Sequence, residues 1–475
     1  MAAHVRFACL AVLSCAFVLA AALPAAPARA ETPEAAAGPA LSFAEAVSRA
    51  LANSASVVAA RHEWASAGRN AENARGRYLP SLVLEERFVR TNVPGEAFAL
   101  KMNQERLLAS DFADPDNFNK PPPISDFITS LTVEQPLFAP RAWLGYRMAA
   151  REAEAAGMDA ERTKEETVHR VLSAYLDALT AKEFVGVAEK GVSDAREHLR
   201  IAEAHEKAGT GLASESLRAR VFLARAESGL VAARSRLALA RTALGLAMGE
   251  ERGTRVDAAD ALPPLPDPGS LESRIAGVGA NRLDLRAFSA RVANAESNVT
   301  LERSGYLPAV GAMGAWQVDS REGPFSPDNR TWKVGVGLSW TLFDGLRREA
   351  AVGKAAEERG KAKAEYRGAG DQAAFEVTRA YLSVDEATRR AEIARAALAA
   401  AEEGSRLVKA RYENQRARMI DLLDAQGALD AARADLVASE NDVRRARADL
   451  EYASGTLLSW ALPQEKAAPA GGANR

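Results

Sequence analysis

The chain has 475 residues, 48% of them hydrophobic and 26% charged, and its formal net charge is −2. Acidic and basic residues that nearly balance argue against nucleic acid as a partner, because nucleic-acid-binding surfaces carry an excess of Lys and Arg. Both cysteines, Cys9 and Cys15, lie near the N-terminus. The rest of the chain therefore has no thiol for a disulfide, a cysteine nucleophile or a thiolate metal site.

Residues 1–30 have the pattern of a secretory signal peptide, with a basic start, an apolar run over residues 7–23 and small residues before Ala30. We expect cleavage after Ala30 and a flexible N-terminus over residues 31–40. Two alternatives stay open at this point. One is an uncleaved membrane anchor, and the other is lipidation of Cys15 in a lipobox-like context.

The two halves of the chain repeat the same landmarks in the same order. Tyr78-Leu79-Pro80 returns as Tyr306-Leu307-Pro308, 228 residues later, whereas the other landmarks return after 205 or 206 residues. The first half therefore holds about 23 extra residues, which we expect to form an exposed, irregular loop. The prediction is a tandem duplication with repeats over residues 41–250 and 271–460, a Pro-rich linker over 251–270 and a flexible tail over 461–475.

Within each half the predicted order is helix, two strands, very long helix and shorter helix. The helical segments are rich in Ala and carry larger apolar residues at three- and four-residue spacing, which is typical of thin helices packed side by side. The longest would extend about 100 Å at ~1.5 Å per residue, more than a compact domain needs. A solvated coiled coil fits the helices alone equally well. The predicted helices cover residues 41–77, 141–207, 212–248, 281–303, 347–412 and 420–452.

Four segments alternate apolar with small or polar residues, the pattern of strands with one apolar face. Trp316, Trp332 and Trp340 lie near the ends of such faces and are predicted to face the membrane. Four strands cannot close a barrel, and open edges in hydrocarbon leave backbone groups without hydrogen bonds. Transmembrane strands would therefore require several chains to share one barrel. The predicted strands cover about 81–91, 126–138, 309–319 and 331–343.

Together these features resemble the TolC-type outer-membrane efflux proteins, from Leu41 to about Leu458. The resemblance implies a mainly α fold with a transmembrane β-barrel portion, in which a homotrimer shares a twelve-stranded barrel joined to a long α-helical periplasmic barrel. It also implies contact with outer-membrane lipid, a periplasmic adaptor protein and an inner-membrane pump. The motifs that carry it are Arg77-Tyr78-Leu79-Pro80, Gln135-Pro136-Leu137-Phe138, Asn281-Arg282-Leu283-Asp284-Leu285, Gly305-Tyr306-Leu307-Pro308, Leu342-Phe343-Asp344-Gly345 and residues 412–426.

The resemblance places adaptor docking at the periplasmic tip, where each long helix turns into the next helix. In the first half this turn holds Gly209, Thr210, Gly211 and Leu212, and glycine suits the backbone angles of such a reversal. The second half departs from the pattern, because Gln415 stands where Gly209 does. The preceding residue, Asn414, is the one we expect to adopt the left-handed conformation there.

The resemblance also implies a closed aperture ringed by acidic side chains, here Asp421 and Asp424. Threefold symmetry would bring six carboxylates together, and such a ring would favour cations. An ordinary solvated helix end is the alternative, since surface ion pairs are common and weak. The candidates that hold the closed tip by hydrogen bonds and salt bridges are Tyr412, Arg416, Arg418 and Glu215.

Nothing in the sequence predicts an enzyme, a cofactor or a metal site. The four histidines beyond the signal show no metal-binding spacing, and no glycine loop for phosphate is present. His198 and His205 share a helix face, and we interpret them as solvated or lumen-lining. The other two are His62 and His169.

The predicted function is the exit duct of a tripartite efflux system in the outer membrane. It would export drugs, toxic compounds or metal ions passively from periplasm to exterior, with a gate at the periplasmic tip that the adaptor and pump open. Two alternatives remain at this stage: a type I protein secretion duct, and a secreted structural coiled coil.

Overall fold

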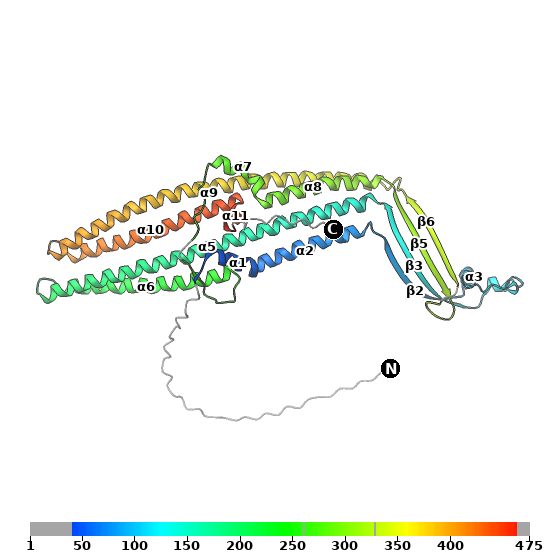
Figure 1. The fold of residues 1–475 in the computed structure, drawn as a ribbon, viewed down its shortest axis with the longest axis horizontal. Coiled ribbons are helices and arrows are strands. Elements are labelled where there is room, and N and C mark those ends of the chain that lie inside the picture. The colour runs from blue at the N-terminus through cyan, green and yellow to red at the C-terminus, as the bar shows by residue number, and fades with distance from the viewer. Residues whose placement is uncertain (1–39, 260–261, 327–328, 463–475) are drawn as a thin grey trace, which may run out of the picture. The chain divides into compact units, whose positions relative to one another are not determined.

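The computed structural model describes residues 40–259, 262–326 and 329–462, so the predicted signal peptide and the tail beyond residue 462 lie outside the described residues. Long helices run side by side, with a four-stranded sheet at one end (Figure 1). The first half contains β1 (Ala40–Leu41), α1 (Phe43–Asn53), α2 (Ala55–Gly76), β2 (Ser81–Thr91), β3 (Ile124–Phe138), α5 (Pro140–Lys207), α6 (Ala213–Ala247) and β4 (Asp257–Ala258). The second contains α7 (Leu271–Asn281), α8 (Leu283–Arg303), a 3-10 turn (Ser304–Tyr306), β5 (Ala309–Ser320), β6 (Arg330–Ser339), α9 (Arg347–Glu413), α10 (Met419–Ser454) and α11 (Leu457–Ala461).

Each half has a helix break. The predicted helix over 41–77 is interrupted at Ser54, whereas the one predicted over 281–303 is found as α8, and a break at Arg282 separates it from α7, a helix that was not predicted. Both breaks have extended backbone angles. Gly249 and Gly455 follow α6 and α10 in the left-handed conformation, and a Cβ on either would lie 2.9 Å from backbone atoms at the break it faces. The breaks therefore make room for the returning chain. We call the level of these two breaks the equatorial region.

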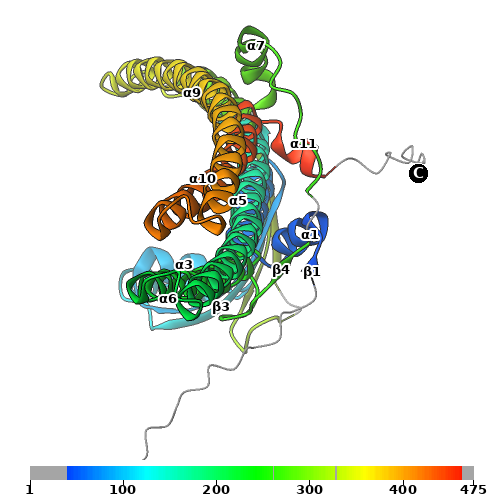
Figure 2. The same cartoon turned by 90° about the vertical axis from the view of Figure 1, so that its left-hand side faces the viewer.

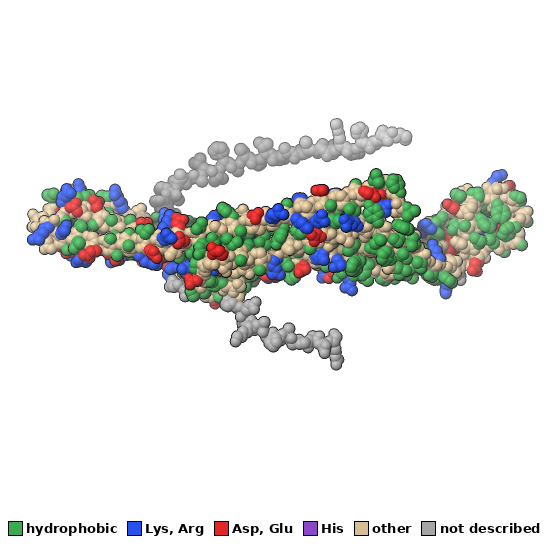
Figure 3. Space-filling model, turned by 90° about the horizontal axis from the view of Figure 1, so that it is seen from above, with side chains coloured by type: hydrophobic (Ala, Val, Ile, Leu, Met, Phe, Trp, Pro, Cys, Tyr) green, Lys and Arg blue, Asp and Glu red, His purple; other side chains and the backbone are tan. Residues whose placement is uncertain are grey.

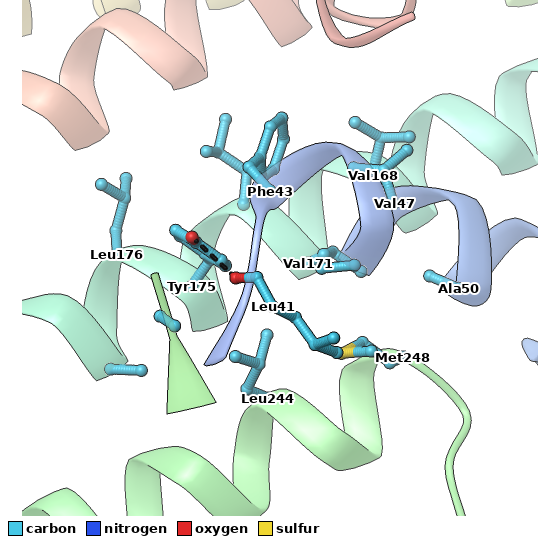
Figure 4. Packing of buried hydrophobic residues seen from close by; sticks show 14 of the residues in the cluster. Leu41, Phe43, Val47, Ala50, Val168, Val171, Tyr175, Leu176, Leu244 and Met248 are labelled. Carbon is cyan, nitrogen blue, oxygen red and sulfur yellow. Dashed lines mark hydrogen bonds between the residues drawn. The ribbon is translucent and has the colours of Figure 1, made fainter. Parts of the chain in front are cut away.

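α5 lies at the centre of a curved layer of helices (Figure 2). It contacts α2 and α8 toward the sheet, and α6 and α10 toward the opposite end, while α9 contacts α8 and α10. The largest buried apolar cluster joins α1, α5 and α6 in the equatorial region (Figure 4). There the single hydroxyl hydrogen of Tyr175 is shared between the carbonyl oxygens of Leu41 at 3.1 Å and Ala259 at 2.7 Å. The core thus joins α5 to β1 at the start of the first half and to the residue that follows β4 at its end.

The sheet runs in the order β2-β3-β5-β6, and every neighbouring pair is antiparallel. Its fourth strand is shorter than predicted, since β6 ends at Ser339 and not at residue 343. The carbonyl oxygens of Thr341 and Leu342 accept hydrogen bonds from the guanidinium of Arg348, at 2.8 and 3.0 Å, in place of a strand partner. Leu346 then has a φ of 64°, so the chain turns into α9.

The extra residues of the first half are more ordered than predicted. The segment over residues 92–123, which we call the outer loop, contains α3 (Pro94–Asn103), a 3-10 turn (Ala109–Phe112) and α4 (Asp116–Asn119). Three phenylalanines form a small apolar core with ring centroids 5.2 to 6.3 Å apart. Local Pro and Asp content favoured an irregular loop, but contacts between residues far apart in the segment order it. The three are Phe98, Phe112 and Phe118.

Candidate functional site

The turns at the two helical tips have the same backbone hydrogen bonds. The amide of Gly209 donates to the carbonyl of Glu206 at 3.0 Å, and the amide of Gln415 donates to that of Tyr412 at 2.9 Å. Gly209 has a φ of 73° and Gln415 a φ of 59°, whereas Asn414 has a φ of −94°. The expectation that Asn414 adopts the left-handed conformation is wrong, because the shared turn geometry decides the position and the residue preference does not.

The tip residues of both turns are solvent-exposed or half-buried. Leu212 leaves 69% of its surface exposed, which is unusual for a large apolar side chain. Gly211 is half-buried, and a Cβ there would lie 2.9 Å from the Cβ of His205, so this second glycine allows the chain to pass close to α5. The exposed polar positions are Thr210, Asn414 and Gln415.

Tyr412 and Glu215 come together from the two different hairpins, α9–α10 and α5–α6. Tyr412 is buried among apolar side chains of both hairpins and stacks on His205 with ring centroids 5.3 Å apart. Burial is the main cause that raises the pKa of Tyr412 to about 12, and the negative charge of the Glu215 carboxylate adds to the effect. A carboxylate oxygen of Glu215 also accepts from the backbone amide of Met419 at 3.5 Å. Glu215 therefore links the first tip to the start of α10.

The two arginines predicted to hold the tip do not contact Glu215. Arg418 pairs with Asp421 on its own helix at 3.3 Å, and the Asp421 carboxylate also accepts from the Arg418 amide at 3.0 Å. Both contacts lower the pKa of Asp421, and the hydrogen bond from the Arg418 backbone has the larger effect. Within the described ranges, Arg416 and Asp424 form no ion pair. Of Asp421 and Asp424, only Asp421 therefore has an ion-pair partner among the described residues.

A buried polar network that the sequence did not reveal joins α5 and α10 close to the tip. His198 is 3% exposed, so the interpretation of this histidine as solvated or lumen-lining is wrong. Its Nε2 lies 3.2 Å from Oε1 of Gln426, whose amide donates to Asp194 at 3.2 Å and to Asp430 at 3.0 Å. Burial raises the pKa of Asp430. The seven-residue spacing from His205 gave no sign of this, because the partners come from another helix.

The sheet has one apolar and one polar face. Cross-strand register places Leu84, Leu131, Trp316 and Trp332 in one row, and Leu82, Val133, Gly314 and Val334 in the next row toward the helices. The opposite face carries polar residues such as Glu85, Ser130, Gln317 and Thr331. Trp340 follows β6, and its indole donates to the carbonyl of Tyr306 at 3.1 Å.

Hydrophobic side chains gather toward the end of the molecule that carries the sheet, whereas charged side chains are spread along the helices (Figure 3). Among the described residues, no helix carries an apolar stretch long enough to cross a membrane.

Comparisons with known proteins agree with this architecture. The chain is 26% identical to the outer membrane efflux protein BepC of Brucella suis over 300 residues, which are 62% of this chain and 64% of that protein. It is 25% identical to the alkaline protease secretion protein AprF of Pseudomonas aeruginosa over 70% of each chain. The crystal structure of the outer membrane protein VceC from Vibrio cholerae superposes with a TM-score of 0.73 at 18% identity, covering 87% of this chain and 96% of that one.

A sequence profile of the outer membrane efflux protein family matches residues 46–250 and 278–456, which together make up well over half of the chain. That family is one of outer-membrane channels and not of enzymes, and a secreted structural coiled coil does not account for the match. Its members lie in the outer membrane and extend into the periplasm. The chain therefore belongs to the outer membrane efflux protein family.

Proposed function

We propose that the chain is one protomer of the outer-membrane exit duct of a tripartite efflux system, which carries drugs, toxic compounds or metal ions passively out of the periplasm. The observation that carries the proposal is the sheet, which has an apolar face, a polar face and two open edges, β2 and β6. An apolar outer face and a polar lumen are typical of outer-membrane barrels. Three copies joined edge to edge would close a twelve-stranded barrel and satisfy the backbone groups of both edges.

The helical layer supports the same assembly, because it is open on the same two sides. α2 and α6 form one edge of the layer and α9 forms the other. Exposed apolar side chains follow both edges, and such stripes on periplasmic helices indicate a contact with another chain. On α6 they include Leu217, Val221, Val231, Leu239 and Leu246, and on α9 Phe375, Leu382 and Ile393.

The proposed resting state is closed at the tip. Contacts of Tyr412 and Glu215 hold the two hairpins together, and Asp424 supplies the carboxylate that favours cations at the aperture. A periplasmic adaptor that binds the exposed turns at Leu212 and Gln415 would shift this equilibrium toward an open tip. The duct itself carries out no chemistry, and the adaptor and inner-membrane pump supply the energy.

A type I protein secretion duct is the second candidate, supported by the 25% identity to AprF. The two candidates differ in cargo and share the duct. Export assays in cells that lack the gene would separate them, since loss of a secreted protein from the medium favours protein secretion, whereas sensitivity to small toxic compounds favours efflux.

The decisive test measures single-channel conductance of the detergent-extracted protein in a planar bilayer, with its oligomer mass in parallel. A trimer with small, cation-selective conductance steps is the expected result. A monomer that needs no detergent and gives no conductance would remove the proposal.

A further inference from the structure

The outer loop encloses a cavity of about 470 Å³ against the ends of β2 and β3. Four cationic side chains line this cavity, but only one carboxylate does, that of Asp111. Phe98 and Phe118 form an apolar wall beside the charges. The cations are Arg90, Lys101, Arg106 and Arg321.

Most of this positive charge has no partner in the protein. Lys101 pairs with Asp111, whereas Arg106 donates only to the neutral amide oxygen of Gln104, at 2.9 Å. Over the part of the chain that the structure describes, Arg90 and Arg321 form no ion pair and no side-chain hydrogen bond. The cavity therefore holds three cationic groups that are not neutralised.

A second cavity lacks this excess of positive charge. The cavity of about 820 Å³ in the equatorial region contains more acidic than basic side chains. They also pair with one another: Arg282 binds Asp284 at 2.6 Å and Glu376 at 2.5 Å, and His169 lies 2.6 Å from Asp449. That cavity therefore has no excess of positive charge to offer an anion, whereas the outer-loop cavity does.

The outer-loop cavity is also held in shape before any ligand binds. The three phenylalanines pack together on one side, and Gln104 is 3% exposed and donates to Ser125 at 2.9 Å and Asp126 at 3.0 Å of β3. Binding to a preformed site costs less conformational entropy, because the loop is already ordered before the ligand arrives. The cavity lies at the end of the sheet away from the helices, which for an outer-membrane protein with periplasmic helices is the cell exterior (Figure 1).

We propose that the outer-loop cavity binds a phosphate group whose apolar substituent packs against Phe98 and Phe118. Arginine guanidinium groups match phosphate oxygens in paired, charge-assisted hydrogen bonds. Two sources share this chemistry: a phosphorylated lipid headgroup of the outer leaflet, and a soluble phosphate ester. The site goes beyond the proposed duct and does not depend on transport through it.

The test is calorimetric titration of the full-length protein in uncharged detergent, once with inorganic phosphate and once with dihexanoyl phosphatidic acid. Saturable binding is expected, and Arg90→Glu combined with Arg321→Glu should weaken it more than tenfold. Phosphatidic acid should bind more tightly than inorganic phosphate, because only the lipid carries an apolar substituent that can reach Phe98 and Phe118. Equal binding of the two would overturn the role proposed for these phenylalanines.

The matched control reverses the charge of two exposed arginines on the periplasmic helix α6, with Arg218→Glu and Arg225→Glu. It changes the net charge of the protein by the same amount as the double variant of the cavity. Arg90→Gln with Arg321→Gln serves if the charge reversal prevents assembly. Absence of saturable binding in the unaltered protein would overturn the site, and so would an equal loss in the control variant, which would indicate general attraction to a basic protein.

Discussion

The equatorial region and the helical tips use the same backbone turn under different constraints. Gly249 and Gly455 end their helices with matching hydrogen bonds, and both face backbone atoms that a Cβ would meet at 2.9 Å. At the tips, a Cβ on Gly209 would meet nothing within 4 Å, and Gln415 occupies the equivalent position. Glycine is thus required where two segments of the chain approach closely, and it can be replaced where only the backbone angle favours it.

The two regions also contain the same type of ion pair with different burial. Arg162 and Glu165 pair at 2.6 Å in the equatorial region with side chains 8% and 1% exposed, whereas the side chains of Arg418 and Asp421 at the tip are 79% and 42% exposed. Arg162 also lies 4.1 Å from the ring centroid of Tyr452. The buried pair therefore depends on both partners, and the exposed pair does not.

The largest expected effect comes from Arg162→Met, which leaves Glu165 buried without a cation. We expect a loss of about 3–5 kcal/mol in the free energy of unfolding. Burial raises the pKa of Glu165, so the folded chain binds this proton more tightly than the unfolded chain, and the loss should shrink as the pH falls toward and below the raised pKa. Denaturant unfolding at several pH values measures this. Arg418→Met is the matched control, and an equal loss there would contradict the comparison.

The next effect is Gly455→Ala in the equatorial region. The left-handed angle costs about 1–2 kcal/mol and the clash with the Arg282 break about 1–3 kcal/mol, so we expect a loss of about 2–5 kcal/mol. Gly209 has a φ of 73°, close to the 72° of Gly455, but open space around its Cα, so Gly209→Ala should lose only the first part. Equal unfolding free energies for the two variants would show that the close backbone approach at Arg282 does not add to the loss of stability in Gly455→Ala.

A smaller effect is expected from exchanging the two tip residues. Gly209→Gln should lower stability by about 1 kcal/mol and Gln415→Gly should raise it by a similar amount, because the two positions share one turn. Hydrogen exchange of the tip amides reports this locally. Changes of the same sign in both variants would mean that the turns are not equivalent.

The last expected effect concerns gating at Tyr412, and conductance measures it directly, because truncating this buried ring also lowers stability. Tyr412→Ala with Glu215→Ala should raise single-channel conductance, whereas Arg416→Ala should not, since Arg416 has no ion pair among the described residues. The raised pKa keeps the phenol protonated, so its contribution is complete below pH 10 and lost only as the pH passes about 12. Conductance that rises already between pH 8 and 9 would exclude Tyr412 from the closed contact.

Sequence reasoning succeeded where the repeat or a local period carried the information. The alternation around Trp332 located β6 and its apolar face, and the spacing of 206 residues aligned Gln415 with Gly209. It failed where a distant partner decides the outcome. His198 has an ordinary helical position, and only Gln426 on another helix makes it a buried, hydrogen-bonded residue.

The sequence by itself determined the duplicated order of helices and strands, the family and the two faces of the sheet, because periodicity and repeated motifs are local properties of the chain. Only the tertiary structure decided the helix breaks at Ser54 and Arg282, the link from Glu215 to α10, and the charged cavity of the outer loop. Each of these depends on contact between segments far apart in the chain, where the fit of backbone to backbone or of charge to charge outweighs local preference.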